Sequence, residues 1–454
     1  MIVLGIESSC DETAVAVVQD GKYLLANTVF SSMDLHTVYG GVVPEIAARS
    51  HIESVIPVIE QALVQAFGKN KDLGAEGAAK KPSPHQPSTS CQSDPWDHID
   101  AIAVTYGAGL GGSLLVGVMT ANTLAIAKNK PLYAINHVEA HVYANFLLGV
   151  GPEGANNDGI LDGKKYSFPA KQSEFPMLAL IVSGGHTQLV LFKGHFDYEI
   201  LGQKRDDAVG EAFDKVAKIV GLPYPGGPSI AKAAVDGDPF KYDFPKARLS
   251  PLKQPRAPES ISQVDVKSAQ RSSDIKHQVS SIHSSTEHNY DFSFSGVKTA
   301  VLRLAQKEIG EDFTFPSFKV SGKLSVAQKN DIAASFQRIA IETLVDKTVL
   351  AYEEFAPKSV VIAGGVAASG ELRKQLSERL RQSMLNQEQP QDAAPQVSSI
   401  KYQVLDIEDI LIYPDMKLCT DNGAMIATLG CYKAMLSQPT ADPYSLSIEP
   451  NLSM

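Results

Sequence analysis

Short apolar runs rich in β-branched residues alternate with stretches of helical periodicity along most of the 454-residue chain. The strand-like runs cover residues 2–6, 14–18, 99–105, 178–182, 187–192, 360–363 and 401–404. The helix-like stretches cover residues 43–66, 113–128, 206–219, 326–355 and 371–384. Because strands that alternate with helices usually form sheets covered by helices, this pattern predicts an α/β fold.

Four polar stretches interrupt the pattern, at residues 69–98, 151–175, 248–290 and 383–399. They contain few periodic apolar residues, so we expect surface insertions that are partly disordered and supply no packed core. Without them about 340 residues remain, which is an ordinary length for two domains.

An internal repeat sharpens the fold prediction. Residues 2–21 and 178–194 each read as a strand, a small polar turn, a threonine, a second strand and a glycine turn. Two ordinary hairpins would give the same pattern, but it also suits duplicated domains that face each other across a cleft. Tight turns of this kind bind anions, because unpaired backbone amides converge on them.

Composition and charge exclude several classes of protein. The 51 acids and 41 bases leave a net charge of −10, which argues against a generally basic surface for nucleic acid but permits a local patch. No apolar stretch reaches the length of a membrane span, and the first residues lack the features of a signal or transit peptide. The four cysteines show no CxxC spacing and are typical of reduced thiols. We therefore expect a cytoplasmic protein without a membrane partner.

Two histidines lie at metal-ligand spacing. His137 and His141 are four residues apart and would lie one above the other on a helix, although such pairs are more often packing or surface residues. A third ligand must come from elsewhere; Asp421, at an expected loop-to-helix junction, is either that ligand or a helix cap. Glu139 is two residues after His137, whereas HExxH metallopeptidases need the acid one residue after the first histidine. This spacing argues against a peptidase.

Three glycine-rich segments suit close backbone approach. Residues 107–112 fit GxGxxG, but the next strand lacks the acid that a dinucleotide site needs, so we favour close packing or phosphate approach. A double glycine at 364–365 ends a buried strand, and a stiff PGGP turn occupies residues 225–228. Before that turn, Asp207, Glu211 and Asp214 would share a helical face, which is usually a solvated one.

Taken together, eight motifs resemble the universal tRNA adenosine threonylcarbamoyltransferases, formerly labelled sialoglycoprotein endopeptidases. In order they are GIESSCDETAVAVV, NHVEAHVYA, VSGGHTQLV, DDAVGEAFDKVAK, YPGGPSIAK, FSFSGVKTAV, VIAGGVAAS and CTDNGAMIA. The resemblance covers essentially the whole chain outside the four polar stretches. It is closest to the bacterial branch of the family.

The resemblance implies a two-lobed actin-, hexokinase- and Hsp70-like fold built from duplicated RNase H-like domains. The N-terminal lobe would comprise residues 1–133 with 446–454, and the C-terminal lobe residues 134–445. The implied reaction transfers L-threonylcarbamoyl from threonylcarbamoyl-AMP to N6 of the adenosine beside the anticodon, in tRNAs that read codons starting with A. AMP is released.

The resemblance also implies roles for particular residues. His137, His141 and Asp421 would bind one divalent metal ion per subunit, iron first, with zinc or magnesium as alternatives. Asp11 and Glu12 are needed for activity, and one of them would accept the N6 proton. The donor would contact Ile181, Val182, Ser183, Gly184, Gly185, Asp214, Gly227 and Ser369. Ser369 replaces the asparagine usual in the family, so we expect a weaker donor contact there.

The implied partners are tRNA, threonylcarbamoyl-AMP, a catalytically inactive paralogue and a small ATPase. The rival functions are a non-catalytic ATP-binding scaffold or sugar-kinase-like enzyme of the same fold, and the disfavoured metallopeptidase. A kinase needs a base near a sugar hydroxyl and has no use for paired metal-binding histidines.

Overall fold

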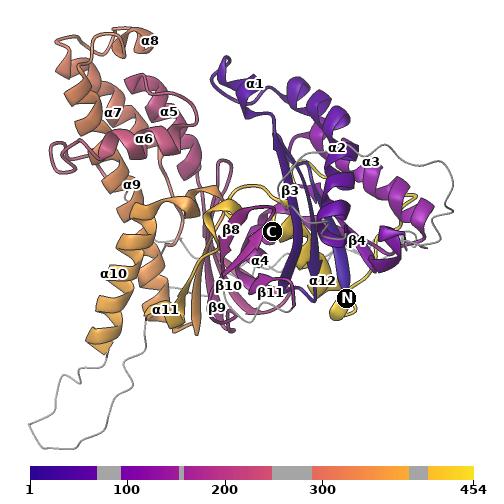
Figure 1. The fold of residues 1–454 in the computed structure, drawn as a ribbon. Helices are drawn as coiled ribbons and strands as arrows, with labels where there is room; N and C mark the ends of the chain where they lie inside the picture. Colours follow the sequence, from indigo (N-terminus) through magenta and orange to yellow (C-terminus); the bar gives the residue numbers. More distant parts are fainter. Residues whose placement is uncertain (69–93, 153–157, 248–288, 388–406) are drawn as a thin grey trace, which may run out of the picture.

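Two mixed sheets form the centre of the molecule (Figure 1), a computed structural model that describes residues 1–68, 94–152, 158–247, 289–387 and 407–454. The first sheet has the order β5-β4-β1-β2-β3-β6 and the second the order β11-β10-β9-β12-β13. The strands of the first sheet are β1 (Ile2–Glu7), β2 (Glu12–Gln19), β3 (Tyr23–Ser31), β4 (Ala101–Gly107), β5 (Leu132–Asn136) and β6 (Gly149–Val150). Those of the second are β9 (Met177–Val182), β10 (Thr187–Gly194), β11 (Asp197–Gln203), β12 (Ser359–Ala363) and β13 (Leu411–Ile412).

The two sheets share one topology. In the first, β1 pairs antiparallel with β2 and parallel with β4; in the second, β9 pairs antiparallel with β10 and parallel with β12. The next strands outward also correspond: β3 pairs antiparallel with β2 as β11 does with β10, and β5 pairs parallel with β4 as β13 does with β12. This correspondence confirms the duplicated actin-, hexokinase- and Hsp70-like architecture expected from the repeat.

Helices form layers outside and between the sheets. Leu4, Ile6 and other alternate residues of the first sheet pack against α2 (Pro44–Phe67) and α3 (Gly111–Lys128). The opposite face packs against α4 (His137–Tyr143) and α12 (Gly423–Met435), which also contact the second sheet through Ile181 and Ala363. The far face of the second sheet is covered by a helical layer. This layer comprises α5 (Val209–Val220), α6 (Gly226–Ala234), α7 (Ser295–Glu308), α8 (Ser317–Val320), α9 (Val326–Phe355) and α10 (Gly370–Gln387).

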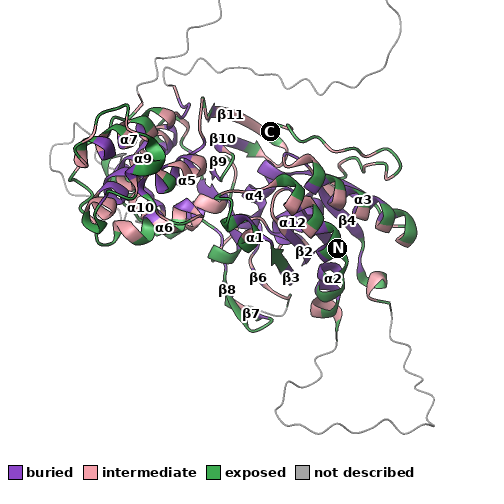
Figure 2. Ribbon diagram, turned by 90° about the horizontal axis from the view of Figure 1, so that it is seen from above, coloured by how far each residue is buried: buried purple, intermediate pink, exposed green. Residues whose placement is uncertain are grey.

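The remaining elements are short. They are α1 (Met33–Thr37), α11 (Ile407–Ile410), the strands β7 (Asp158–Leu161) and β8 (Lys164–Ser167), and the 3-10 turns η1 (Pro95–His98), η2 (Ala144–Phe146), η3 (Gly365–Ala368) and η4 (Met416–Leu418). Figure 2 shows the inner strands of both sheets as mostly buried, whereas the helical layer presents exposed residues outward. Within the described residues, none of the helices combines the length and the apolar character that a bilayer crossing requires.

Most of the strands and helices expected from the sequence are present, with two corrections. Helix α5 begins at Val209, so Asp207 precedes the helix and does not share a face with Glu211. Residues 158–167, expected in a polar insertion, form the β7-β8 hairpin, which buries Tyr166 in the core between the sheets. The expected strand at 401–404 lies outside the described residues, as do most of the insertions at 69–98, 248–290 and 383–399.

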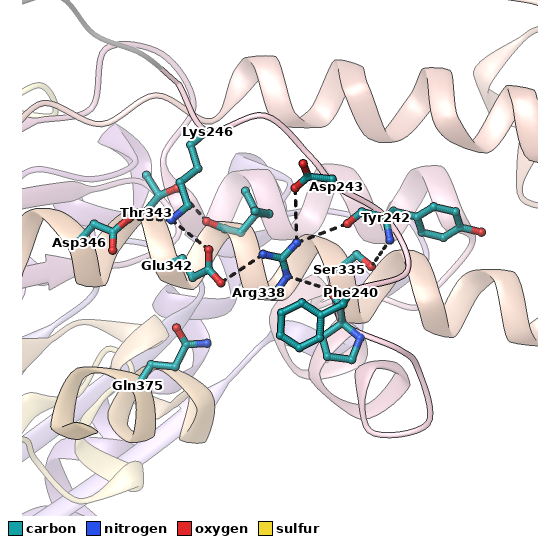
Figure 3. A network of polar contacts seen from close by, with 12 residues as sticks. Phe240, Tyr242, Asp243, Lys246, Ser335, Arg338, Glu342, Thr343, Asp346 and Gln375 are labelled. Carbon is teal, nitrogen blue, oxygen red and sulfur yellow. Dashed lines mark hydrogen bonds and ion pairs between the residues drawn. The ribbon is translucent and has the colours of Figure 1, made fainter. Parts of the chain in front are cut away.

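The helical layer is fastened by a polar network on α9 (Figure 3). The Arg338 Nε donates to the Pro239 carbonyl at 2.7 Å, and its Nη1 lies 3.2 Å from Glu342 Oε1. Lys246 Nζ pairs with Asp346 at 2.7 Å. A cavity of about 660 Å³ adjoins this network between α6, α9 and α10, and its lining includes none of the site residues expected from the sequence.

Candidate functional site

The two histidines come from a helix that starts immediately after a strand. Helix α4 begins at His137, because the Asn136 side chain caps it and accepts hydrogen bonds from the amides of Val138 and Glu139 at 2.9 and 3.3 Å. His137 and His141 therefore lie one turn apart, with ring centroids separated by 4.7 Å.

Asp421 reaches both histidines from the other end of the chain. Its Oδ1 lies 3.5 Å from His137 Nε2 and 3.4 Å from His141 Nε2. Asp421 is not the helix cap: Asn422 caps α12, accepting from the Met425 amide at 3.0 Å. The Asp421 carboxylate is therefore not used as a helix cap and can act together with the two histidines.

This cluster fits a divalent cation. One ligand atom from each of His137, His141 and Asp421 lies within 4.8 Å of the others. The Nε2 of buried His141 has no hydrogen-bond partner among the described residues, although a buried polar atom normally has one. Two imidazole nitrogens and a carboxylate oxygen suit a transition metal such as iron or zinc, whereas magnesium prefers oxygen ligands.

Charges are concentrated around these three side chains. Burial alone would lower the pKa of His137, but the charges of Asp421 and Glu7 raise it to about 9. Burial raises the pKa of Asp421 to about 6 despite the nearby His137 charge. Burial, followed by the charge of His137, lowers the pKa of His141 well below its usual value. A bound cation would favour ionised Asp421 and neutral histidines.

A second carboxylate, which the sequence reasoning missed, lies behind His137. Fully buried Glu7 places its Oε2 3.2 Å from His137 Nδ1. The available signal was an acid at the end of the apolar strand at residues 2–7, where an unpaired charge would be costly.

The first hairpin turn holds Asp11 and Glu12 beside the cluster. The Asp11 carbonyl accepts hydrogen bonds from the amide and hydroxyl of Ser32 at 3.0 and 2.8 Å. Ser32 in turn bonds buried His36. Burial, with the charges of Asp421 and Asp11, raises the pKa of Glu12 to about 9. Two carboxyl groups therefore lie within electrostatic reach of the candidate ligands.

The second hairpin turn is open. Gly184 and Gly185 are exposed, and nothing lies within 4 Å of where a side chain would begin on either residue. The Ser183 amide donates to the His186 carbonyl at 2.9 Å. The side chains of Ile181 and Val182 are buried between or behind the sheets, so these two residues can approach a ligand only through their backbone.

Asp214 lies on α5, Gly227 in the first turn of α6, and Ser369 between η3 and α10. The Asp214 carboxylate accepts the Gly226 amide at 2.7 Å, and Gly227 has open space beside it. Burial, then the charges of Asp214 and Asp11, raises the pKa of Tyr224, so this side chain lies within electrostatic range of the first hairpin.

The hydroxyl of Ser369 has a structural partner. It accepts a hydrogen bond from the Leu372 amide at 3.3 Å, at the start of α10. The turn that contains Ser369 approaches the second hairpin through Gly364, which has φ +89° and would place a Cβ 2.5 Å from the Val182 carbonyl.

Two alternatives raised by the sequence gain no support from the structure: a dinucleotide site at residues 107–112 and a peptidase that uses Glu139. A Cβ on Gly107 would lie 2.1 Å from the Glu449 carbonyl, and one on Gly109 would lie 2.6 Å from the Ser9 carbonyl, so packing within the chain already explains these glycines. Burial raises the pKa of Glu139 to about 7, and the charge of Lys433 on α12 opposes the shift.

Comparisons with known proteins agree with the motifs. The model of the family described as tRNA N6-adenosine threonylcarbamoyltransferase matches residues 23–82, 93–154 and 163–428. A protein with this description from Thermomicrobium roseum is 38% identical over 441 residues, 96% of this chain and 92% of that one. Another, from Dehalococcoides mccartyi strain CBDB1, is 38% identical over 454 residues, 100% of this chain and 99% of that one. Among solved structures, the ROK hexokinase from Thermus thermophilus is 14% identical, with a TM-score of 0.36, and covers 96% of this chain and 100% of that one.

Proposed function

The chain belongs to the tRNA N6-adenosine threonylcarbamoyltransferase family, and we propose that it performs the family's reaction with His137, His141 and Asp421 as ligands of a divalent cation. The protein is an acyltransferase that forms threonylcarbamoyladenosine in tRNA. The observation that carries the proposed site is the convergence of these three side chains between the two hairpin turns.

The chemistry explains what the site must supply. The N6 amine of adenine is a weak nucleophile, because its lone pair is delocalised into the ring. The acyl group must therefore arrive activated, as threonylcarbamoyl-AMP, and must be held in line with the amine of the adenosine beside the anticodon. A bound cation, iron or alternatively zinc or magnesium, would neutralise the phosphate of the leaving AMP.

The two hairpin turns supply the residues for donor binding and proton transfer. The turn that begins at Ser183 binds the donor through the exposed backbone of Gly184 and Gly185, because open amides at a tight turn suit anionic oxygens. Asp11 or Glu12 accepts the proton that leaves N6.

The rest of the donor pocket falls on Asp214, Gly227 and Ser369, together with the backbone of Ile181 and Val182. The open space beside Gly227 admits a ligand close to the main chain. Asp214 positions this turn, because its carboxylate holds the Gly226 amide.

We assign the inactive paralogue to the outer surface of α2 and α3. Ile52 and Ile56 of α2 are 66% and 51% exposed, and Leu115 and Met119 of α3 are 49% and 56% exposed. A paralogue of the same fold carries the same pair of helices and can pair apolar side chains with apolar side chains. Because the chain has a net charge of −10, tRNA affinity without partners should be weak and salt-sensitive. A small ATPase and a cytoplasmic setting, where tRNA is available, complete the proposal.

Reconstitution tests the proposal. Purified protein, the paralogue, the ATPase, synthetic threonylcarbamoyl-AMP and unmodified tRNA are combined, and the digested tRNA is analysed by nucleoside mass spectrometry. We expect threonylcarbamoyladenosine and stoichiometric AMP, with neither formed when donor is omitted. Absence of the modified nucleoside in the complete mixture would contradict the proposed site. Formation of a sugar phosphate from ATP and hexose would favour the kinase alternative.

A further inference from the structure

We propose that Glu7 is a positioning residue that fixes the ring orientation and tautomer of His137, so that the Nε2 of this histidine is available to the cation. The inference rests on the proposed metal site and adds a residue to which the reaction assigned no role. Its basis is geometry. The last residue of β1 sends a carboxylate under the first residue of α4, which follows β5 two strands away in the same sheet.

The Glu7 carboxylate is itself held rigidly. Its Oε1 accepts the Ser9 amide at 2.5 Å, and its Oε2 accepts the Thr105 hydroxyl at 2.5 Å. The third contact is His137 Nδ1, 3.2 Å from Oε2. Strands β1 and β4 are paired in the sheet, so Glu7 and Thr105 lie on a rigid base.

These contacts select one tautomer. An ionised carboxylate only accepts hydrogen bonds, so His137 must carry its proton on Nδ1 to satisfy Glu7. The Ser9 hydroxyl, 3.1 Å from the same nitrogen, can share that proton. The lone pair of a neutral ring then lies on Nε2, which is the nitrogen that faces Asp421. A carboxylate behind a metal-binding histidine orients the ring and raises its basicity.

The second histidine has no equivalent support. Neither ring nitrogen of His141 has a hydrogen-bond partner among the described residues. The geometry therefore gives the two ligands different tasks: His137 is prepared by the protein, whereas His141 is oriented mainly by its position on α4 and by the cation itself.

The test is Glu7→Gln in the full chain. An amide cannot satisfy all three donors: with its oxygen toward Ser9 it presents NH₂ to His137 Nδ1, and in the flipped orientation its NH₂ meets the Ser9 amide. We expect affinity for Fe²⁺ or Zn²⁺, measured by competition with a chromophoric chelator, to fall about 10- to 100-fold. Glu139→Gln is the matched control, because it makes the same change on the ligand helix away from the cation, and it should leave this affinity unchanged.

A second measurement needs no variant. In zinc-loaded wild-type protein, ¹⁵N NMR of the imidazoles should show His137 protonated at Nδ1 and bonded to zinc through Nε2. That pattern supports the inference even if Glu7→Gln fails to fold. Wild-type affinity in Glu7→Gln, or zinc on Nδ1 of His137, would overturn it. If the wild-type protein binds no cation through His137 and Asp421, the proposed metal site itself fails, which is a different result.

Discussion

The two hairpin turns occupy equivalent places in the duplicated fold but differ in every chemical respect. The turn between β1 and β2 carries Asp11 and Glu12 and is tied to its surroundings through Ser32. The turn between β9 and β10 is Ser183-Gly-Gly-His186, with open backbone at Gly184 and Gly185. Duplication produced two equivalent turns. After divergence, one turn carries charged side chains and the other exposes backbone amides.

The largest effect should follow from removing the carboxylate beside the first turn. Asp421→Ala, like His137→Ala or His141→Ala, takes away one of three ligands, so we expect loss of bound metal and at least about a 100-fold loss of activity. Metal content by elemental analysis and product formation measure this. Asp236→Ala, an exposed acid outside the cluster, is the control. Full metal occupancy in any ligand variant would remove that residue from the set.

Two glycine substitutions near the second turn distinguish a residue needed for fold stability from a residue needed for donor binding. Gly364→Ala should destabilise the fold by about 3 kcal/mol, because the residue has φ +89° and a Cβ would strike the Val182 carbonyl at 2.5 Å. Gly185→Ala meets open space and should change stability by less than about 0.5 kcal/mol, while weakening donor binding. Denaturant unfolding and donor titration distinguish them. Equal donor affinity in Gly185→Ala would show that the open turn is not the donor surface.

The turns should also give opposite pH dependences of stability in metal-free protein. Burial, with nearby acids, raises the pKa of Glu12 from 4.5 to about 9, so the folded state binds more protons in that window and stability falls as pH rises. Burial lowers the pKa of His186 from 6.5 to about 4, so the unfolded state binds more protons there and stability rises with pH between those values. At roughly 1.4 kcal/mol per pKa unit, the contribution is on the order of 6 kcal/mol for Glu12 and on the order of 3 kcal/mol for His186.

Glu12→Gln should therefore flatten the decline above pH 4.5, and His186→Asn should flatten the rise between pH 4 and 6.5. Unfolding free energies in urea at several pH values measure both slopes. If both substitutions changed the pH dependence of the unfolding free energy in the same direction, the predicted difference between the two turns would be wrong.

The smallest effect concerns Ser369. Its hydroxyl accepts the Leu372 amide at the start of α10, and asparagine caps helices equally well, so Ser369→Asn should keep the fold. The longer amide can both donate and accept toward the donor, and one extra neutral hydrogen bond is worth about 0.5–1.5 kcal/mol, or a few-fold in affinity. Donor titration decides this. Abolished binding would mean that the pocket is built around serine.

Local patterns in the sequence predicted what depends on local physics. The spacing of His137 and His141 placed both rings on one side of α4, because helical geometry alone decides this. The repeat predicted two equivalent hairpins, since alternating apolar residues and tight turns form them without help from distant residues.

Long-range contacts were beyond the sequence patterns. Glu7 gave no sign of its partner, because His137 is 130 residues further along the chain. The sequence pattern predicted Asp207 on the same helix as Glu211, but the helix starts only at Val209. Lys215 forms ion pairs with both acids. The β7-β8 hairpin escaped notice because its strands are polar on the outside and bury mainly Tyr166.

Helix α12 has a consequence for how the protein is made. Near the end of the chain, it covers strands formed by the first twenty residues: Gly5 meets Ala427, Gly423 meets Val15, and Cys431 lies against the Val18 carbonyl. During synthesis one face of the first sheet must therefore wait until residues 423–435 have left the ribosome. Asp421 arrives in the same step, just ahead of this helix. The nascent protein thus has no complete ligand set until its N-terminal sheet can be closed.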